Sequence, residues 1–145
     1  MSYWDTSALG KLYVQEPDSE DFERKAASDA VIVTSSLARL EMHRIAFRKE
    51  TGGQIPVQTA EEILRQLDQD IASGDIRIVT LDQAVEAAFG NIMAACYRQP
   101  VPIPLRTFDA LHLASARVAG ETEIVATDKT LRTAAKHLGF SIYPL

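Results

Sequence analysis

The stretch VIVTSSLARLEMHR, residues 31–44, joins a short β-branched run to a segment with the apolar spacing of a helix. VIVT at 31–34 is typical of a buried strand, because β-branched side chains pack well on a pleated sheet. Ser35 or Ser36 can cap the following helix, which we expect to end before Gly52. A buried strand that leads directly into a helix indicates an α/β protein.

The same alternation continues on both sides of this stretch. Further strands are expected at SYW (2–4), RIVTL (77–81), IVAT (124–127) and SIYPL (141–145). Further helices are expected at 8–14, from about 18 to 26, and at 59–73, 82–96, 106–120 and 129–138. Thr59 with Glu62 matches a capping box, and Asp82 can cap the helix that it precedes. Short strands separated by helices predict an α/β fold with a central parallel sheet and helices on both faces.

The length and composition fit a single soluble globular domain spanning residues 1–145. Hydrophobic residues make up 46% of the chain and charged residues 24%, which is ordinary for such a domain. No apolar run approaches the ~18 residues of a membrane span, and the start MSYWD lacks the features of a secretory leader, so we expect no membrane contact and a cytoplasmic location. The net charge of −5 argues only weakly against nonspecific nucleic-acid binding. The lone Cys96 is expected to be a buried, inert thiol.

Four acidic residues stand in or just after apolar segments, namely Asp5, Glu41, Asp109 and Asp128. A carboxylate among apolar side chains is costly unless it is hydrogen-bonded, protonated or bound to a cation. Several such carboxylates in one chain therefore suggest a shared cation site. Because the candidate ligands are all oxygen atoms, the sequence predicts Mg²⁺ (or Mn²⁺) in preference to zinc.

All of these acids fit one edge of the predicted sheet. Asp5 directly follows SYW and Asp128 directly follows IVAT, and parallel sheets bind ligands beyond the carboxyl ends of their strands. Glu41 lies about two turns into the helix after VIVT, on a face that it shares with apolar residues. Asp109 lies in a helix that is apolar nearly all round, so we expect its side chain to point inward.

Each of these residues also has a purely structural interpretation. Asp5 and Asp128 precede helices and can cap them. Glu41 can form an ion pair with Arg44, three residues later on the same helix. His112 could join a metal, but a packed or hydrogen-bonded helix residue is the simpler interpretation. We favour a shared site because independent caps and surface acids would rarely converge on one edge of one sheet.

Four segments of the chain, taken in order, resemble the PIN-domain ribonucleases and most closely the VapC toxins of bacterial toxin–antitoxin pairs: YWDTSALGKLY (3–13), SSLARLE (35–41), DALHLASA (109–116) and DKTLRTAAKHLGF (128–140). Each segment is short, but their order and spacing together are specific, and the resemblance covers essentially the whole chain. It implies a three-layer sandwich with a central parallel sheet and a Mg²⁺- or Mn²⁺-dependent endoribonuclease. It also implies a homodimer that is inhibited by a small cognate antitoxin protein, which also binds DNA.

By this resemblance, the acidic positions of the family fall on Asp5, Glu41, Asp109 and Asp128. Thr6 or Ser7 then supplies a hydroxyl that helps hold the first carboxylate or a bound water. One departure is that Thr127 directly precedes Asp128, whereas the family often places its Thr or Ser two residues before that acid. The role of Thr127 is therefore left open at this point.

The expected chemistry is hydrolysis of an RNA phosphodiester by a metal-activated water. Asp5 and Asp109 are expected to be the principal metal ligands, and Asp128 a direct or water-mediated ligand. Glu41 is expected to be a ligand or to orient the attacking water. The RNA backbone is expected to contact basic residues near the same edge, namely Arg44, Arg48, Arg106 and Lys129. The alternatives are a housekeeping RNA-processing nuclease, a DNA-directed nuclease or phosphatase, and a catalytically silent regulatory domain.

Overall fold

A five-stranded parallel sheet with the strand order β3-β2-β1-β4-β5 forms the centre of the computed structural model, which describes residues 1–145. The strands are β1 (Ser2–Trp4), β2 (Ile32–Ser35), β3 (Ile76–Val79), β4 (Glu123–Val125) and β5 (Ser141–Tyr143). The predicted parallel α/β sheet is confirmed. Strand boundaries differ from the predicted ones by up to two residues, and β4 in particular ends at Val125.

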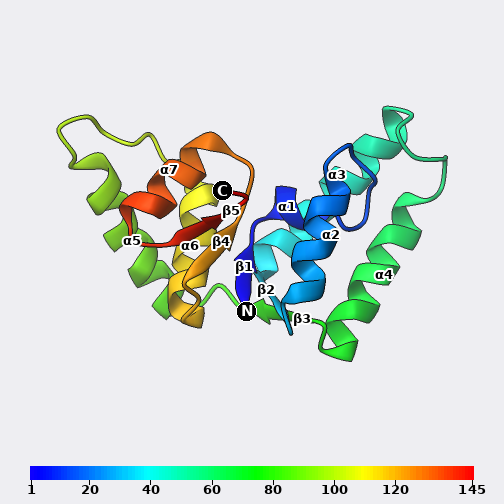
Figure 1. Ribbon diagram of the computed structural model, residues 1–145, viewed down its shortest axis with the longest axis horizontal. Helices are drawn as coiled ribbons and strands as arrows, with labels where there is room; N and C mark the ends of the chain where they lie inside the picture. Colours follow the sequence, from blue (N-terminus) through cyan, green and yellow to red (C-terminus); the bar gives the residue numbers. More distant parts are fainter.

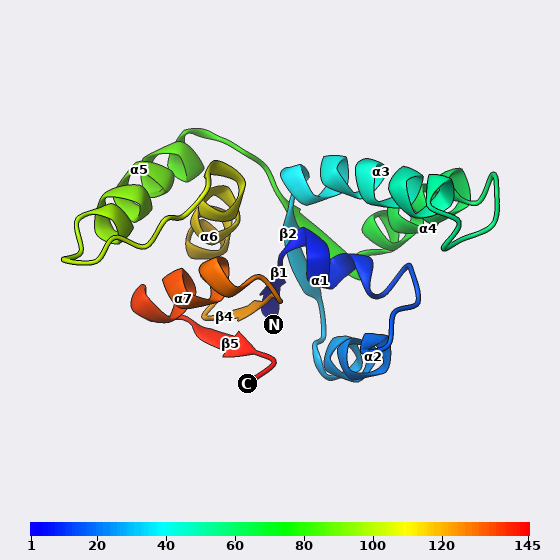
Figure 2. The same cartoon turned by 90° about the horizontal axis from the view of Figure 1, so that it is seen from above.

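Seven helices surround this sheet, namely α1 (Thr6–Gly10), α2 (Ser19–Ser28), α3 (Ser36–Thr51), α4 (Ala60–Ser73), α5 (Gln83–Tyr97), α6 (Thr107–Ala119) and α7 (Lys129–His137). In both views α1 to α4 lie on one side of the sheet and α5 to α7 on the other (Figures 1 and 2). The expected three-layer sandwich is therefore confirmed. None of these helices is long and apolar enough to cross a membrane.

The short strand β1 separates two hydrophobic cores. Because successive side chains of a strand point to opposite faces, Tyr3 and Trp4 enter different cores. Tyr3 packs with buried residues of α5, α6 and α7, whereas Trp4 packs with those of α1 to α4. Cys96 lies in the Tyr3 core as a buried free thiol, as predicted.

The connections that follow the two central strands β1 and β4 lead to opposite faces of the sheet. β1 lies between β2 and β4, and the helix that follows β1 lies on the opposite face from the helix that follows β4. The chain therefore leaves these two neighbouring strands towards opposite faces, and such a switch opens a crevice between their carboxyl ends. Asp5 directly follows β1 and Asp128 lies three residues beyond β4, so both acids flank this crevice.

Four predicted helix caps are confirmed, and each uses a short polar side chain: Asp5, Ser35, Asp82 and Asp128. The Ser35 hydroxyl accepts a hydrogen bond from the backbone N–H of Ala38, at 3.3 Å. The Asp82 carboxylate accepts one from the N–H of Val85, at 3.1 Å. Asp128 caps α7 in the same way, so its interpretation as a helix cap is confirmed.

One predicted helix start and one predicted capping box are wrong. The helix expected at 8–14 begins at Thr6 and ends at Gly10, because Asp5 caps it two residues earlier than expected. The capping box at Thr59 does not form, since the Thr59 hydroxyl donates to the carbonyl of Pro56 instead. The N–H of Ala60 bonds to the Glu50 carboxylate of α3, so a tertiary contact has replaced the local cap.

We predict that Leu113→Ala in α6 lowers the free energy of unfolding by about 2–5 kcal/mol, because the side chain is fully buried between the sheet and α5. The matched variant Leu40→Ala in α3 should change it by about 0.5 kcal/mol or less, since that side chain is 67% exposed. Urea denaturation followed by circular dichroism measures both. Similar losses for the two variants would contradict the placement of α6 against the sheet.

Candidate active site

A cavity of about 440 Å³ lies at the carboxyl edge of the sheet. All of the predicted acids line it, together with both predicted hydroxyl residues, three of the predicted basic residues and His112: Asp5, Glu41, Asp109, Asp128, Thr6, Ser7, Arg44, Arg48, Arg106 and His112. These residues come from the ends of β1 and β4 and from α1, α3 and α6. The crossovers of the fold therefore bring distant parts of the sequence to one cavity.

Asp5 is a buried carboxylate at the end of β1. Its backbone N–H bonds to the carbonyl of Val125 in β4, which fixes its place beside the neighbouring strand. Its Oδ1 accepts the N–H of Ala8 at 2.9 Å, and the Ser7 hydroxyl lies 3.0 Å from each carboxylate oxygen. Burial raises the pKa of Asp5 from 3.8 to about 6 despite these donors. Asp5 thus caps α1, and burial destabilises its ionised form at the crevice.

Glu41 is held by two donors from other elements. The Thr6 hydroxyl donates to Glu41 Oε1 at 2.6 Å, and His112 Nε2 lies 3.1 Å from the same oxygen. Burial alone would raise the pKa of Glu41, but the hydrogen bonds from His112 and Thr6 lower it below its usual value. The alternative partner, Arg44, lies in the same cavity and acts on Glu41 through its charge alone. Glu41 is therefore kept ionised at neutral pH.

Asp109 and Asp128 share one arginine. Arg106 Nε lies 3.5 Å from Asp109 Oδ2, and another nitrogen of the same guanidinium lies 3.7 Å from Asp128 Oδ2. Burial, followed by the charge of Asp128, raises the pKa of Asp109. Because the Arg106 side chain is 75% exposed, solvent screens this attraction. The guanidinium therefore offsets the repulsion between the two acids only in part.

The donor chemistry of the cavity fits a hard divalent cation. Asp109 Oδ2 is a buried oxygen without a hydrogen-bond partner, which is costly unless a cation satisfies it. The candidate ligands around it are all carboxylate oxygens, which Mg²⁺ and Mn²⁺ prefer. In their present rotamers, no three of the acidic, histidine or cysteine side chains lie close enough to hold one ion. Binding would therefore draw the carboxylates together.

The hydroxyl residues of the cavity form hydrogen bonds with two different acids. Ser7 holds Asp5, whereas Thr6 bonds to Glu41 and lies 3.1 Å from His112 Nε2. Thr127, whose role was left open, places its hydroxyl 3.2 Å from that of Ser7. Because the Ser7 hydrogen points to Asp5, Thr127 is the donor in this contact. It links the end of β4 to the start of α1.

The interpretation of His112 as a buried, hydrogen-bonded helix residue is confirmed, since its side chain is 4% exposed and bonds through both ring nitrogens. Its contact with Glu41 was not foreseen. The one signal in the sequence is its spacing, because His112 follows Asp109 by three residues and so shares its inward face. The buried partner on its other side, Tyr3, carries no such signal.

The basic residues do not all reach the cavity. Arg44 and Arg48 of α3 line it together with Arg106. Lys129 instead lines a separate cavity of about 390 Å³, beside the proline-rich loop that includes Val101. The cationic lining of the acidic cavity therefore consists of arginines alone.

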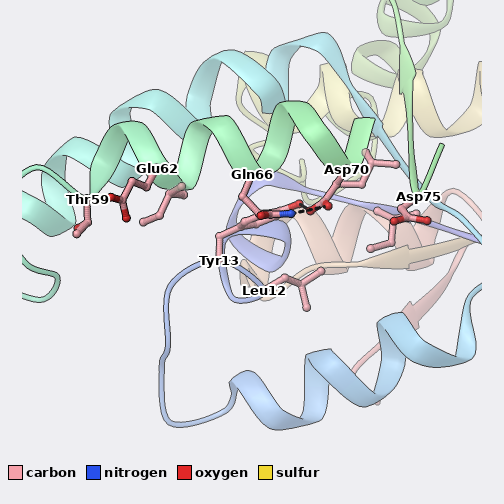
Figure 3. Close-up of a pocket in the computed structure, with 10 residues that line it drawn as sticks. Leu12, Tyr13, Thr59, Glu62, Gln66, Asp70 and Asp75 are labelled. Atoms are coloured by element: carbon pink, nitrogen blue, oxygen red, sulfur yellow. Dashed lines mark hydrogen bonds between the residues drawn. The ribbon is translucent and has the colours of Figure 1, made fainter. Parts of the chain in front are cut away.

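A larger cavity, of about 550 Å³, lies on the α1 to α4 side of the sheet and shares no residue with the acidic cavity. Figure 3 shows it, with Tyr13 donating a hydrogen bond to Asp70 of α4. Its lining is half apolar and contains no basic residue. Its acids, Glu62, Asp70 and Asp75, face no arginine that could bind a phosphate, so we assign the chemistry to the smaller cavity.

Comparison with known proteins identifies the family of the chain. The PIN domain family model matches residues 2–137. Ribonuclease VapC46 of Mycobacterium tuberculosis is 31% identical over 142 residues, which cover 97% of this chain and 94% of the relative.

Two solved structures share the fold. VapC20 of Mycobacterium tuberculosis, described as a sarcin-ricin loop cleaving toxin, superposes with a TM-score of 0.70 at 18% identity, covering 92% of this chain and 95% of its own. VapBC2 of Rickettsia felis, solved with a DNA fragment from its promoter, gives a TM-score of 0.67 at 14% identity, covering 98% of this chain and 97% of its own. The chain therefore belongs to the PIN domain family, in its VapC branch.

Proposed function

We propose that this protein is a Mg²⁺- or Mn²⁺-dependent endoribonuclease and the toxin of a toxin–antitoxin pair. The observation that carries the proposal is the cavity at the carboxyl edge, which is lined by one buried and three half-buried acids and by three arginines, and in which one oxygen of Asp109 accepts no hydrogen bond. The relative named Ribonuclease VapC46, 31% identical over nearly the whole chain, supports RNA as the substrate.

Asp5 and Asp109 would be the principal ligands of the cation, because they are the acids that burial most disfavours as free charges. Asp128 would join directly or through a water, since its side chain is more exposed to solvent than those of Asp5 and Asp109. When bound, such an ion would lower the pKa of a water and offset negative charge on the leaving oxygen.

The remaining residues of the cavity act on the substrate and on the attacking water. Glu41 is ionised and held in place, so it can orient a water or accept its proton. Arg44 and Arg48 face the same cavity from α3 and can donate to phosphate oxygens, which positions RNA without reading its sequence. A substrate with splayed, single-stranded nucleotides would suit such a backbone grip.

A protein partner completes the proposal. The VapBC2 structure of similar fold is a complex bound to promoter DNA, which supports a small antitoxin that also binds DNA. A basic side chain of such a partner could enter the acidic cavity and pair with its carboxylates in place of the cation. We also propose a homodimer, a single nuclease domain spanning 1–145 and a cytoplasmic location, as the family resemblance implies.

The first prediction of the proposal is that cleavage depends on a hard divalent cation. EDTA should abolish cleavage of an RNA pool by the purified protein, and Mg²⁺ or Mn²⁺ should restore it. Asp5→Asn and Asp109→Asn should each lower kcat by about 100-fold or more, because each removes a charged ligand. Asp68→Asn, an exposed acid of α4, is the matched control and should keep full activity.

The same assay separates the alternatives. DNA of the same sequence and a phosphomonoester should be turned over far more slowly than RNA. Full activity in EDTA would rule out the metal mechanism, and faster turnover of DNA or of the phosphomonoester would favour the corresponding rival. A folded protein that cleaves none of the three with metal present would favour a regulatory domain.

A second prediction concerns stability in EDTA. The folded pKa of Asp5, about 6, lies above its ordinary value of 3.8, so its contribution to stability is present below pH 4 and is lost as pH rises through 6. Asn can still cap α1 but carries no charge, so Asp5→Asn should be more stable than wild type at pH 7.5, by up to about 3 kcal/mol. The difference should shrink towards pH 4.5.

Urea unfolding of both proteins at the two pH values measures this difference. A variant that is less stable than wild type at pH 7.5 would show that the hydrogen bonds of the Asp5 carboxylate outweigh the cost of its burial. The comparison of two proteins at one pH removes the effect of other titrating groups, such as Glu41.

A third prediction concerns the toxin role. Strong expression of the protein alone should arrest growth of a bacterial host, and Asp5→Asn should abolish the arrest. Co-expression of the small protein encoded beside the gene should restore growth. Normal growth in cells that contain soluble wild-type protein, active on RNA in vitro, would count against the toxin role and favour a housekeeping nuclease.

A further inference from the structure

A chain of buried polar groups leads from the hydrophobic core to the acidic cavity. It begins at Tyr3 of β1, whose hydroxyl lies 2.7 Å from His112 Nδ1 in α6. It continues from His112 Nε2 to Glu41 Oε1 of α3, at 3.1 Å. Tyr3 is fully buried and the His112 side chain 4% exposed, whereas Glu41 is 30% exposed to the cavity. The chain thus connects three elements and ends at an acid assigned to the chemistry.

The hydrogen bonds around Thr6 determine which ring nitrogen of His112 carries a proton. Thr6 lies 2.6 Å from Glu41 Oε1, and an ionised carboxylate can only accept, so the single hydroxyl hydrogen of Thr6 is used there. The Thr6 oxygen also lies 3.1 Å from His112 Nε2, and in that contact it can only accept. Nε2 must therefore carry a hydrogen, which is shared between Thr6 and Glu41.

Tyr3 accounts for the other ring nitrogen. Its hydroxyl is buried and His112 Nδ1 is its hydrogen-bond partner in the structure. A buried phenol stays protonated and needs an acceptor, and an imidazole that is protonated at Nε2 offers one at Nδ1. The edge-to-face packing of the two rings, with centroids 5.8 Å apart, holds the donor and acceptor in place. The Tyr3 hydroxyl thus favours the same Nε2–H tautomer that the contacts of Nε2 with Thr6 and Glu41 require.

The tautomer decides whether Glu41 is attracted or repelled. With Nε2 protonated, Glu41 Oε1 receives two donors, from His112 and Thr6, while its Oε2 accepts no hydrogen bond from the chain. With Nδ1 protonated instead, the lone pair of Nε2 would face the carboxylate, and the Tyr3 hydroxyl could no longer donate to Nδ1. One hydroxyl in the core therefore controls an acid in the cavity.

We propose that His112 is a positioning residue, which the Tyr3 hydroxyl holds in the Nε2–H tautomer so that it anchors Glu41 Oε1 and leaves Oε2 for the reaction. The proposal rests on the proposed function in one respect, because the role of Glu41 in cleavage is assigned there. It assigns a task to Tyr3, which lies in the hydrophobic core and lines no part of the acidic cavity. Such supporting hydrogen bonds typically change metal affinity or activity about 10–100-fold.

Tyr3→Phe tests the proposal because it deletes only the hydroxyl and keeps the buried ring. It should lower kcat on RNA by about 10–100-fold and leave KM unchanged, since Tyr3 touches no substrate. Tyr13→Phe is the matched control. It also deletes a hydroxyl that donates to a partner, Asp70, but in the separate cavity of Figure 3. Its kcat should equal that of wild type.

A pair of substitutions at His112 separates positioning from packing. Gln places an amide nitrogen near the position of Nε2 and can still donate to Glu41, whereas Asn places its amide near Nδ1 and cannot. His112→Gln should therefore retain more activity than His112→Asn when both are compared as folded protein. A purely structural histidine would instead give losses of kcat that follow the losses of unfolding free energy.

The tautomer itself is observable by NMR of the wild-type protein with ¹⁵N-labelled histidine. His112 should show an unprotonated Nδ1 and a protonated Nε2, and Tyr3→Phe should increase the population of the other tautomer, because only the contacts at Nε2 then oppose it. A protonated Nδ1 in wild type, or a Tyr3→Phe kcat within about twofold of wild type, a difference of only about 0.4 kcal/mol, overturns the proposal. If wild type cleaves no RNA, the proposed function fails, while the NMR result still decides the arrangement of His112.

Discussion

Burial of the Asp5 carboxylate at the centre of the sheet is the constraint on which the rest of the site depends. The chain leaves β1 and its neighbour β4 towards opposite faces of the sheet, and Asp5 at the end of β1 is only 5% exposed. The charge is tolerated because the start of α1, through Ala8 and Ser7, supplies donors to it. Those hydrogen bonds do not offset the cost of burying the charge completely, and the pKa of Asp5 is therefore raised.

The other acids reach the same cavity with different local compensation. Glu41 is stabilised by two hydrogen-bond donors, Thr6 and His112, and forms no ion pair with an arginine. Asp109 and Asp128 depend on an exposed guanidinium, which compensates weakly, and the Asp109 oxygen that faces it accepts no hydrogen bond. The electrostatic cost is therefore concentrated on Asp5 and Asp109, the residues whose pKa values are raised. A cation bound between Asp5 and Asp109 would relieve most of this electrostatic cost. The two acids that are most destabilised as free charges are therefore the two proposed as principal ligands.

The sequence predicted the architecture because strand and helix patterns are local properties. Runs such as VIVT, followed by a capping serine, carry their structure in a few neighbouring residues, and the position of acids at strand ends then places them on one edge. Contacts that depend on tertiary packing were missed. The cap of α4 comes from Glu50 of α3 and not from Thr59, and Glu41 bonds to His112 of a different helix and not to Arg44. Neither partner could be identified before the crossovers were known.

The position of the site is set by charge and topology and not by the size of a cavity. The largest cavity, with Tyr13 and Asp70 in its lining, is half apolar and has acids but no arginine to face a phosphate. The smaller cavity combines both signs of charge, because acids follow the central strands while arginines project from α3 and from the start of α6. This mixture suits a reaction that needs a cation at the oxygens of the scissile phosphate and hydrogen-bond donors along the RNA backbone. The sheet order produces it, since residues as distant in sequence as Asp5 and Asp128 can meet only where β1 and β4 are neighbours.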